Sequence, residues 1–457
     1  MVDVPQDLLR KYDKPGPRYT SYPTVPVWTN EFGEDDYRQA LATLATKPQV
    51  ELCVYLHLPF CAKRCHYCGC NALSAQGNGT VAKYLDSVER ELELLTAIFG
   101  SELRVVQLHW GGGTPNFLNR RQLRRAVELL KGAFYWDAEA EISLEADPRV
   151  GTPEQAALLR ELGFNRISLG VQDFDPSVQK AIGRDQSEAR TRRFYAACRE
   201  TGFSSVNLDL VYGLPGQTRE TFARTLSLVR ELDPDRIACF SYAHVPWVRP
   251  NQEFVDTSRM PDPTEKFDLF RQSLTTLNDA GYEWIGMDHF ARPTDELTLA
   301  RHARTLHRNF MGYTTRPAAD LLALGMSGIS ELADCFAQNS SDLDVYQDQI
   351  SAGRLPIVRG HRLSKSDSLR RAAITHIMCN LELPFDLVAD THGIRLDEEL
   401  ASELERLEPL VDDGLLVREE TRLRVTDLGR FFLRNICMEL DAYLDQESNQ
   451  PLFSRTV

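Results

Sequence analysis

Long hydrophobic runs are absent from this chain. None of its 457 residues falls in an apolar stretch that approaches the ~18–20 residues needed to cross a bilayer, so we expect no membrane-spanning segment. The opening residues, Met1–Asp7, hold neither a basic region nor an apolar core, and we expect no signal peptide. These absences favour a cytoplasmic protein, in which thiols stay reduced.

Positive charge is also in short supply. Lys and Arg together number 52 against 66 Asp and Glu, which gives a formal net charge of -14. Such an acidic balance argues against general binding to nucleic acid or to membrane surfaces. It does not exclude a small anionic substrate, because a few buried arginines can dominate a pocket locally. Internal repeats and low-complexity stretches are missing, and the length allows two or three domains with a large core.

Cysteine is sparse and unevenly spread. Of the ten cysteines, six are scattered among mostly apolar neighbours and need no role beyond packing. The other four fall within ten residues: Cys61, Cys65, Cys68 and Cys70. The first three have the spacing C-x-x-x-C-x-x-C. Four-iron clusters usually take four cysteines, so three would leave one iron without a protein ligand and open to a substrate or cofactor.

Two other uses of these thiols are less well supported. A structural zinc site wants two tight ligand pairs or a Cys/His set, and although His66 lies beside Cys65, no second group follows at zinc-finger distance. A disulfide knot is disfavoured in a chain of this size with no sign of secretion. The cysteines follow the apolar segment Leu52–Pro59, which predicts a strand that runs into a loop.

Short apolar runs alternate with longer amphipathic ones from about Leu52 to Ala243. The predicted strands are Cys53–His57, Val105–Trp110, Glu141–Glu145, Arg166–Val171, Ser205–Val211 and Ile237–Tyr242. The predicted helices are Val81–Phe99, Arg120–Phe134, Pro153–Leu162, Glu188–Thr201 and Thr218–Leu232, with Gly163 and Gly202 at helix ends. This alternation predicts a parallel sheet, either a partly open barrel or a doubly wound sheet. Distinctive polar or glycine-rich patches follow each strand, at the edge where such folds carry their sites.

The rest of the chain is organised differently. We expect a helix at Thr264–Ala280 and a strand at Glu283–Phe290, then helices near Leu369–Cys379 and Leu396–Leu410, a hairpin at Gly414–Thr426 and a last helix near Asp427–Leu444. The predicted domains are an N-terminal strap and extension (1–50), a barrel (51–290), a linking or substrate-side segment (291–365) and a mainly helical, winged-helix-like domain (366–457). Within the first, Lys14–Pro23 is either a surface strap or a flap over the active site.

The three-cysteine run after a first barrel strand resembles the radical S-adenosylmethionine superfamily. The fuller pattern, with Cys70 included, resembles the oxygen-independent coproporphyrinogen III oxidase family. The motifs that carry this resemblance span nearly the whole chain: Gly16–Pro23, Cys61–Cys70, Leu108–Pro115, Gly170–Phe174, Gly286–Pro293, Leu306–Tyr313 and Arg434–Met438. One position departs from the family, which commonly has Gln where this chain has Met311.

The resemblance implies a fold, an activity and cofactors. The fold is an α/β partial (β/α)6 barrel of radical S-adenosylmethionine type, with an N-terminal strap and a C-terminal mainly helical domain. The activity is oxidative decarboxylation of two propionates of coproporphyrinogen III to vinyls, which gives protoporphyrinogen IX for haem biosynthesis without oxygen. A 5′-deoxyadenosyl radical would abstract hydrogen, with two S-adenosylmethionine molecules consumed. We expect a monomer that receives electrons from a low-potential donor such as flavodoxin or ferredoxin.

The resemblance also implies a set of site residues. One [4Fe–4S] cluster would be held by Cys61, Cys65 and Cys68. The residues expected to bind S-adenosylmethionine are Tyr55, Tyr67, Gly112, Gly113, Thr114, Glu145, Gln172, Arg184, Asp209, Ala243 and Ile329. Without the resemblance, Glu145 and Asp209 could equally cap helices, and Arg184 could be a surface charge. The substrate-side candidates are Arg18, Tyr19, Cys70, Arg292, Arg308 and Phe310, for which an exposed or packing role is the simpler alternative.

Two rival functions use the same scaffold. A non-catalytic haem-binding chaperone is the first, and it is disfavoured by Cys70, by the strap Lys14–Pro23 and by the motif Gly286–Pro293. A radical enzyme that acts on RNA, read by the C-terminal domain, is the second. The acidic balance of the chain speaks against RNA binding.

Overall fold

The computed structural model describes residues 3–47, 50–74, 77–100, 103–316, 320–444 and 453–456. The chain folds into two compact units, each built from separate segments. The sheet unit comprises Thr29–Ala280 and Ala318–Arg362, and the terminal unit comprises Met1–Trp28, Gly281–Pro317 and Leu363–Val457. The domain boundaries expected from the sequence stay a prediction. None of the helices in the described residues is both long and apolar enough to cross a membrane.

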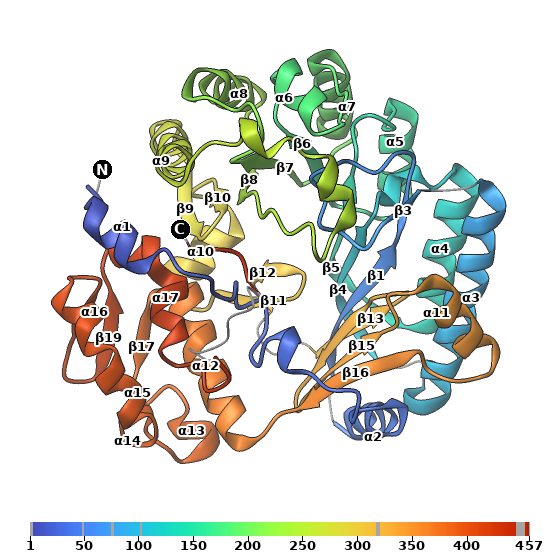
Figure 1. The fold of residues 1–457 in the computed structure, drawn as a ribbon. Coiled ribbons are helices and arrows are strands. Elements are labelled where there is room, and N and C mark those ends of the chain that lie inside the picture. Colours follow the sequence, from blue (N-terminus) through green and yellow to red (C-terminus); the bar gives the residue numbers. More distant parts are fainter. Residues whose placement is uncertain are drawn as a thin grey trace. The chain divides into compact units, whose positions relative to one another are not determined.

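A mostly parallel sheet forms the centre of the sheet unit (Figure 1). Six strands lie side by side in chain order and run parallel: β1 (Glu51–Leu58), β4 (Arg104–Gly112), β5 (Tyr135–Ala146), β6 (Arg166–Gln172), β7 (Ser205–Tyr212) and β8 (Arg236–Ser241). All six predicted strands are therefore confirmed. Strands β1, β4 and β7 are buried over most of their length, whereas most of β5 is half-buried or exposed.

The sheet continues beyond β1 on its other side. Strand β13 (Asp320–Leu324) pairs parallel with β1, and β14 (Ile329–Leu332), β15 (Cys335–Asn339) and β16 (Ile357–Arg362) follow in antiparallel order. These strands lie in the segment that the sequence predicted as linking or substrate-side. In the sheet unit the strand order runs linearly from β16 to β8, so the barrel is open, as predicted.

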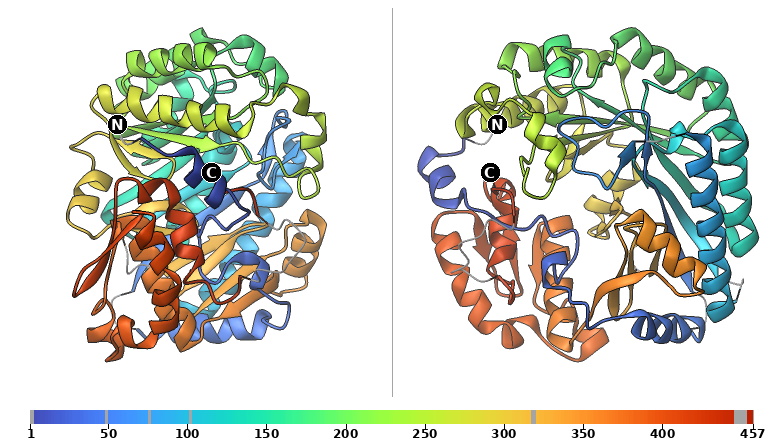
Figure 2. Two further views of the ribbon diagram at one scale, coloured as in Figure 1. Left: turned by 60° about the vertical axis from the view of Figure 1, so that its left-hand side comes forward. Right: turned by 45° about the vertical axis from the view of Figure 1, so that its right-hand side comes forward.

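Helices cover one face of this sheet (Figures 1 and 2). They are α3 (Asn78–Phe99), α4 (Arg120–Ala133), α5 (Pro153–Glu161), α6 (Pro176–Ala181), α7 (Glu188–Glu200), α8 (Arg219–Leu232) and α9 (Pro263–Asp279). All were predicted except α6, whose six residues are too few to show a helical period. Gly163 and Gly202, with φ of 106° and 83°, follow the ends of α5 and α7, as expected. Two more helices of this unit, α2 (Glu34–Ala45) and α11 (Leu343–Ser351), both lie beside α3.

Helix α4 shows how the local sequence sets these elements. Asn119 caps it by accepting a hydrogen bond from the Gln122 backbone, and the Gln122 side chain accepts one from the Asn119 backbone, both at 3.0 Å. Leu123, Val127 and Leu130 then fall on one buried face at helical spacing. The capping signal and the apolar period agree, which is why the predicted and observed boundaries differ by one residue.

The terminal unit contains shorter elements. They are α1 (Gln6–Tyr12), β9 (Glu283–Gly286), β10 (His289–Ala291), α10 (Glu296–His302), β11 (His307–Asn309), β12 (Gly312–Thr314), α12 (Lys365–Asn380), β17 (Glu382–Pro384), α13 (Ala389–His392), α14 (Leu396–Glu399), α15 (Ala401–Arg406), α16 (Glu408–Asp412), β18 (Leu416–Arg418), β19 (Arg422–Val425) and α17 (Leu433–Met438). The predicted hairpin is confirmed as β18 and β19, and β17 pairs on the other side of β19. Helix α12 confirms the predicted helix near Leu369–Cys379.

Three predictions for this unit were wrong in detail. Glu283–Phe290 is an antiparallel hairpin and not one strand, because the chain turns at Met287, whose φ is 41°. Leu396–Leu410 is divided into three short helices, since Leu400 leaves the helical region and a new helix begins at Glu408, with Pro409 in its first turn. The last helix ends at Met438, well before Leu444; beyond it, the carboxylate of Asp441 accepts a hydrogen bond from the Tyr443 backbone.

The strap Lys14–Pro23 is fastened to the C-terminal part of its own unit. The guanidinium of Arg434 donates to the Pro17 carbonyl oxygen at 2.9 Å, and the Gly16 backbone donates to the Ser454 carbonyl at 3.1 Å. Arg434 also donates to the Gly16 carbonyl, and the Ala442 backbone donates to the Tyr22 hydroxyl. Within the terminal unit the segment is thus a strap with many backbone partners.

Candidate active site

The cysteine loop begins where β1 ends. After Leu58 the chain forms the two-residue strand β2 (Phe60–Cys61) and then an irregular loop that closes at β3 (Leu73–Ser74). Cys61 and Cys65 are buried and Cys68 is half-buried. All three thiols therefore come from one short segment at the carboxyl end of the first strand, as the sequence predicted.

Each of these sulfurs accepts a hydrogen bond. The Thr114 hydroxyl donates to Cys61 Sγ at 3.3 Å, and the Cys70 backbone donates to Cys68 Sγ at 3.4 Å. Cys65 Sγ accepts from two guanidinium groups, as described below. Burial raises the pKa of Cys61 to about 11, although the Thr114 bond opposes that rise. A hydrogen bond from the Cys70 thiol lowers the pKa of Cys68 to about 6.

This donor set fits a cluster bound by thiolates. Among the described residues, no three His, Cys, Asp or Glu side chains converge closely enough to enclose a single metal ion. A four-iron cluster does not need its ligands to converge on one ion, because each thiolate binds a separate iron. The three thiols come from one loop and each accepts a hydrogen bond, and their role as cluster ligands stays a prediction.

Two arginines contact the loop, one from the segment after β5 and one from the segment after α6. Arg149 and Arg184 each place a guanidinium nitrogen 3.5 Å from Cys65 Sγ. They share the carboxylate of Asp147, at 2.7 Å from Arg149 and 3.2 Å from Arg184. Burial alone raises the pKa of Asp147, but the two positive charges outweigh it and hold that pKa below its ordinary value. Arg184 is buried, so it is not an exposed surface charge.

The glycine run Gly111–Gly113 ends β4 against the cysteine loop. The Gly113 backbone donates to the Leu58 carbonyl at 2.8 Å. A Cβ at Gly113 would lie 2.6 Å from the Pro59 carbonyl carbon, and one at Gly112 would lie 2.6 Å from the His57 ring. Gly112 also has φ of 113°, which a residue with a side chain rarely adopts. Glycine is required here because two backbones meet, and this close approach leaves bare backbone at the strand end.

Four side chains gather beside that run. The Tyr55 hydroxyl lies 3.1 Å from His57 Nδ1, and the Tyr55 ring stacks on His109 with centroids 6.0 Å apart. Glu145 Oε2 accepts from the Gly112 backbone at 3.2 Å, while its Oε1 lies 3.6 Å from His109 Nε2. Burial raises the pKa of Tyr55 and lowers that of His57, so both are neutral near pH 7. The structure thus brings Tyr55, Gly112 and Glu145 together.

Asp209 and Gln172 come from the next strands along the sheet. Asp209 accepts from the Ser168 hydroxyl at 2.8 Å and from the Asn207 amide at 2.7 Å. Burial, with the charge of Glu145 added, raises the pKa of Asp209 to about 7. Gln172 is buried with φ of 68°. Asp209 lies within β7 and Glu145 within β5, and the helices that follow are capped by other residues.

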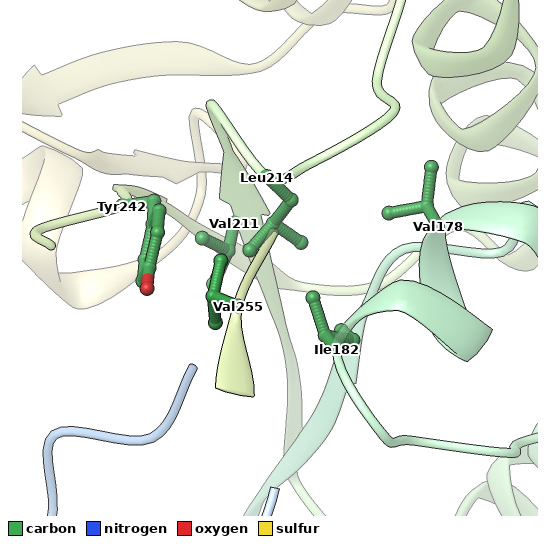
Figure 3. Packing of buried hydrophobic residues seen from close by; sticks show 6 residues of the cluster. All are labelled: Val178, Ile182, Val211, Leu214, Tyr242 and Val255. Carbon is green, nitrogen blue, oxygen red and sulfur yellow. The ribbon is translucent and has the colours of Figure 1, made fainter. Parts of the chain in front are cut away.

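The remaining predicted cofactor residues lie on three different segments. Tyr67, in the cysteine loop, packs against a cluster of buried apolar side chains formed by Val178, Ile182, Val211, Leu214, Tyr242 and Val255 (Figure 3). The Ala243 carbonyl, after β8, accepts a hydrogen bond from Gln252 at 3.2 Å. Ile329 is the first residue of β14 and is half-buried.

Comparison with known proteins places this site in a family. Residues 55–229 match the family described as Radical SAM superfamily, where SAM is S-adenosylmethionine, and residues 363–432 match the HemN C-terminal domain. The chain is 42% identical over 456 residues to the oxygen-independent coproporphyrinogen III oxidase of Escherichia coli K12, covering 100% of this chain and 99% of that protein. The chain belongs to the oxygen-independent coproporphyrinogen III oxidase family.

Other relatives agree. The protein of the same name from Synechocystis is 40% identical over 460 residues, covering 100% of this chain and 98% of that one. The solved structure of coproporphyrinogen III oxidase (HemN) from Escherichia coli, described as a radical SAM enzyme, superposes with a TM-score of 0.92 at 41% identity over 97% of this chain and all of that one. The predicted family, enzyme class and fold class are confirmed. Membership of this radical SAM family implies a [4Fe–4S] cluster and S-adenosylmethionine.

The structure gives the strap Lys14–Pro23 a specific set of contacts. In the terminal unit, Arg18 pairs with the buried carboxylate of Asp288. The Tyr19 hydroxyl donates to Asp441 at 3.0 Å. Both side chains are therefore engaged within their own unit, and their substrate-side role stays a prediction.

The other substrate-side candidates lie in two places. In the terminal unit, the Arg292 guanidinium lies 3.8 Å from the Tyr282 ring centroid, Arg308 donates to the Met287 sulfur at 2.8 Å, and Phe310 packs edge-on against Trp28 at 5.7 Å. Cys70, by contrast, is exposed in the sheet unit. Met311 is half-buried in the turn between β11 and β12.

Sequence reasoning missed several residues of this family member's site. Asp147 and Arg149 were not proposed, although Asp147 lies in a strand-end patch and could have been found there. Asn251 and Gln252 also went unnoticed, yet both donate hydrogen bonds to the cysteine loop. Neither residue belongs to a motif or a periodic pattern, so the sequence offered no signal for them.

Proposed function

We propose that this protein converts two propionate side chains of coproporphyrinogen III to vinyl groups without oxygen, giving protoporphyrinogen IX. Each conversion removes one hydrogen atom from a propionate β-carbon, one carbon dioxide and one further electron. Two molecules of S-adenosylmethionine are consumed for each substrate. The observation that carries the proposal is a three-thiol loop joined by backbone hydrogen bonds to a glycine run, in a chain related over its full length to enzymes of this name.

In the sheet unit, separate groups of residues would bind the cluster and S-adenosylmethionine. Cys61, Cys65 and Cys68 would hold the [4Fe–4S] cluster, and the bare backbone at Gly111–Gly113 would receive the amino acid end of S-adenosylmethionine. With both bound, the site supplies a low-potential electron and a carbon radical strong enough to abstract hydrogen. The guanidinium groups next to Cys65 offset the negative charge of thiolates in a buried place.

Carboxylates at the strand ends would orient the rest of the cofactor. Glu145 already accepts a backbone hydrogen bond from Gly112 and keeps a second oxygen near His109. Asp209 is held by Ser168 and Asn207. A carboxylate fixed in this way accepts hydrogen bonds from ribose hydroxyls or an ammonium group without having to reorganise.

The substrate carries four carboxylates, and we propose that cations of the terminal unit recognise them. Arg18, Arg292 and Arg308 are the candidates, each already ordered by a contact within that unit. An arginine whose side chain is already placed loses less conformational freedom when it binds a carboxylate.

The decisive experiment is anaerobic turnover. Reconstituted protein is incubated with coproporphyrinogen III, S-adenosylmethionine and a low-potential reductant, and vinyl product, carbon dioxide, methionine and 5′-deoxyadenosine are quantified. We expect two carbon dioxide and two methionine molecules for each protoporphyrinogen IX. Haem binding without any vinyl product or methionine release would reject the enzyme and favour the haem-binding chaperone.

Three further properties complete the proposal. We infer a cytoplasmic location, supported by the ten cysteines, all of which lie within the described residues and are free thiols. We infer a low-potential electron donor such as flavodoxin or ferredoxin, because reductive cleavage of a sulfonium requires one. We also expect a monomer, and sedimentation velocity measures that directly.

A further inference from the structure

The segment that follows β8 reaches back to the cysteine loop. Its 3₁₀ helix, Pro250–Phe254, carries Asn251, whose side-chain Nδ2 donates to three backbone carbonyls of the loop. The acceptor oxygens belong to Cys65 at 3.2 Å, His66 at 3.0 Å and Cys68 at 3.0 Å. An amide nitrogen carries two hydrogens, so the three carbonyls share them.

The next residue, Gln252, binds the one carbonyl of Cys65–Cys68 that Asn251 does not, that of Tyr67. Gln252 is 1% exposed, and its Nε2 donates to the Tyr67 carbonyl at 2.8 Å and to the Ala243 carbonyl at 3.2 Å. Its Oε1 accepts from the Val245 backbone at 2.6 Å, which fixes the orientation of the amide. Two adjacent side chains thus bind all four consecutive carbonyls from Cys65 to Cys68. An irregular loop has few partners of its own for such groups, and unpaired buried carbonyls are costly.

Two further contacts join the same segments. The Arg249 guanidinium donates to the Asn71 side-chain oxygen at 2.9 Å, and the Phe254 ring lies 5.6 Å from the His66 ring. The Asn71 carbonyl oxygen also forms a hydrogen bond with His57 Nε2 at 2.9 Å. The segment therefore contacts the loop at both ends as well as in the middle.

We propose that Asn251 and Gln252 are positioning residues for the iron–sulfur cluster. They fix the backbone from Cys65 to Cys68, and through it the direction in which the Cys65 and Cys68 thiolates point. The inference rests on the proposed function only for the assignment of the cluster to these thiols. The inference has a specific consequence. Loss of the hydrogen bonds from Asn251 or Gln252 to the loop should let iron leave the protein faster, with the fold otherwise kept.

Asn251 offers a sharp test because its role depends on a donor. Asn251→Asp keeps the size of the side chain but turns an acceptor toward three carbonyl oxygens, and Asn251→Ala removes the donor. A matched control is Asn165→Ala. The Asn165 side chain donates to the Ala140 carbonyl at 2.8 Å and accepts from the Ile142 backbone at 2.9 Å, so it also bridges backbone groups, but at the start of β6 and away from the loop.

The measurement is anaerobic release of iron from cluster-loaded protein to a ferrous chelator. Loss of two hydrogen bonds of ordinary strength makes loop opening roughly ten- to thirty-fold more frequent, so we expect Asn251→Ala to lose iron that much faster. Asn251→Asp should lose it faster still. Asn165→Ala should stay within about two-fold of the wild-type rate even if its thermal midpoint falls.

Two other readouts separate positioning from general stability. In the cluster-free proteins, hydrogen exchange of the amides at 62–70 should rise in Asn251→Ala and not in Asn165→Ala. In the reduced loaded proteins, the electron paramagnetic resonance signal of Asn251→Asp should broaden. If Asn251→Ala cannot be recovered, Asn251→Ser keeps one donor and should release iron at an intermediate rate.

The outcomes are distinct. Iron release from Asn251→Ala, or from Asn251→Ser in its place, within two-fold of wild type would overturn the inference, as would an equal acceleration in Asn165→Ala. Failure of the wild-type protein to assemble a cluster would instead count against the proposed function.

Discussion

Glu91 is a buried carboxylate whose titration makes the free energy of unfolding depend on pH. It lies in α3 and is 2% exposed. Its Oε2 accepts from the Gly325 backbone at 2.8 Å and from the Tyr346 hydroxyl at 2.7 Å, and its Oε1 accepts from the Asn339 amide at 2.7 Å. These bonds hold the turn that precedes β14. Burial nevertheless outweighs them and raises the pKa of Glu91 from 4.5 to about 7.

The direction of the effect follows from linkage. A folded state with the higher pKa binds the proton more tightly than the unfolded chain does. Glu91 therefore contributes stability that is fully present below about pH 4.5 and is lost as the pH rises through about 7. A shift from 4.5 to about 7 corresponds to about 3 kcal/mol in total, of which about 2 kcal/mol falls between pH 5.5 and 8.

Glu91→Gln removes this titration while keeping the size of the side chain. We expect the free energy of unfolding of the wild type, minus that of the variant, to fall by about 2 kcal/mol from pH 5.5 to pH 8. Urea unfolding of both cluster-free proteins at several pH values measures it. Other buried acids, such as Asp209, titrate in both proteins and cancel in the difference. A difference that stays constant, or that rises with pH, would refute the reasoning.

Three other predictions concern the site. Cys65→Ser should abolish the brown cluster absorbance and turnover while the cluster-free protein keeps its thermal midpoint within a few degrees; a variant that retains a full cluster would refute the ligand assignment. Gly113→Ala places a Cβ 2.6 Å from the Pro59 carbonyl carbon, so the dissociation constant for S-adenosylmethionine in equilibrium dialysis should rise at least about ten-fold, whereas Gly132→Ala, with nothing within 4 Å, should leave it unchanged. Equal constants for the two variants would contradict that. Arg18→Ala, which unpairs Asp288, should slow porphyrinogen turnover several-fold more than cleavage of S-adenosylmethionine; equal losses would argue against a substrate-side strap.

Much of the sheet unit could be predicted because its signals are local. The capping box at Asn119 and the apolar period of α4 both act within a few residues, and the six parallel strands are apolar runs set between such helices. The terminal unit was harder. Its short helices α14 to α16 are separated at Leu400 and Leu407, and only the second break has a residue type that marks it, Pro409 in the first turn of α16.

The site residues also divide into those with a local sequence pattern and those without one. The spacing of Cys61, Cys65 and Cys68 is a local pattern and was found at once. Glu91, by contrast, looks like an ordinary polar residue of an amphipathic helix, and its burial depends on strands more than 200 positions later in the chain, as its bond to Gly325 shows (|i−j| = 234). The bond from Asn251 to Cys65 spans 186 positions. Contacts of this range have no signature in a single sequence.

The hold of Arg434 on Gly16 and Pro17 has a consequence for biosynthesis. Gly16 and Pro17 leave the ribosome long before Arg434, which follows 418 and 417 positions later, so they must wait for this partner. At ordinary translation rates that delay is roughly 20–80 s. During that time the sheet unit is able to complete its fold while the strap Lys14–Pro23 stays available to chaperones, so the hydrogen bonds that fasten the strap form late in translation.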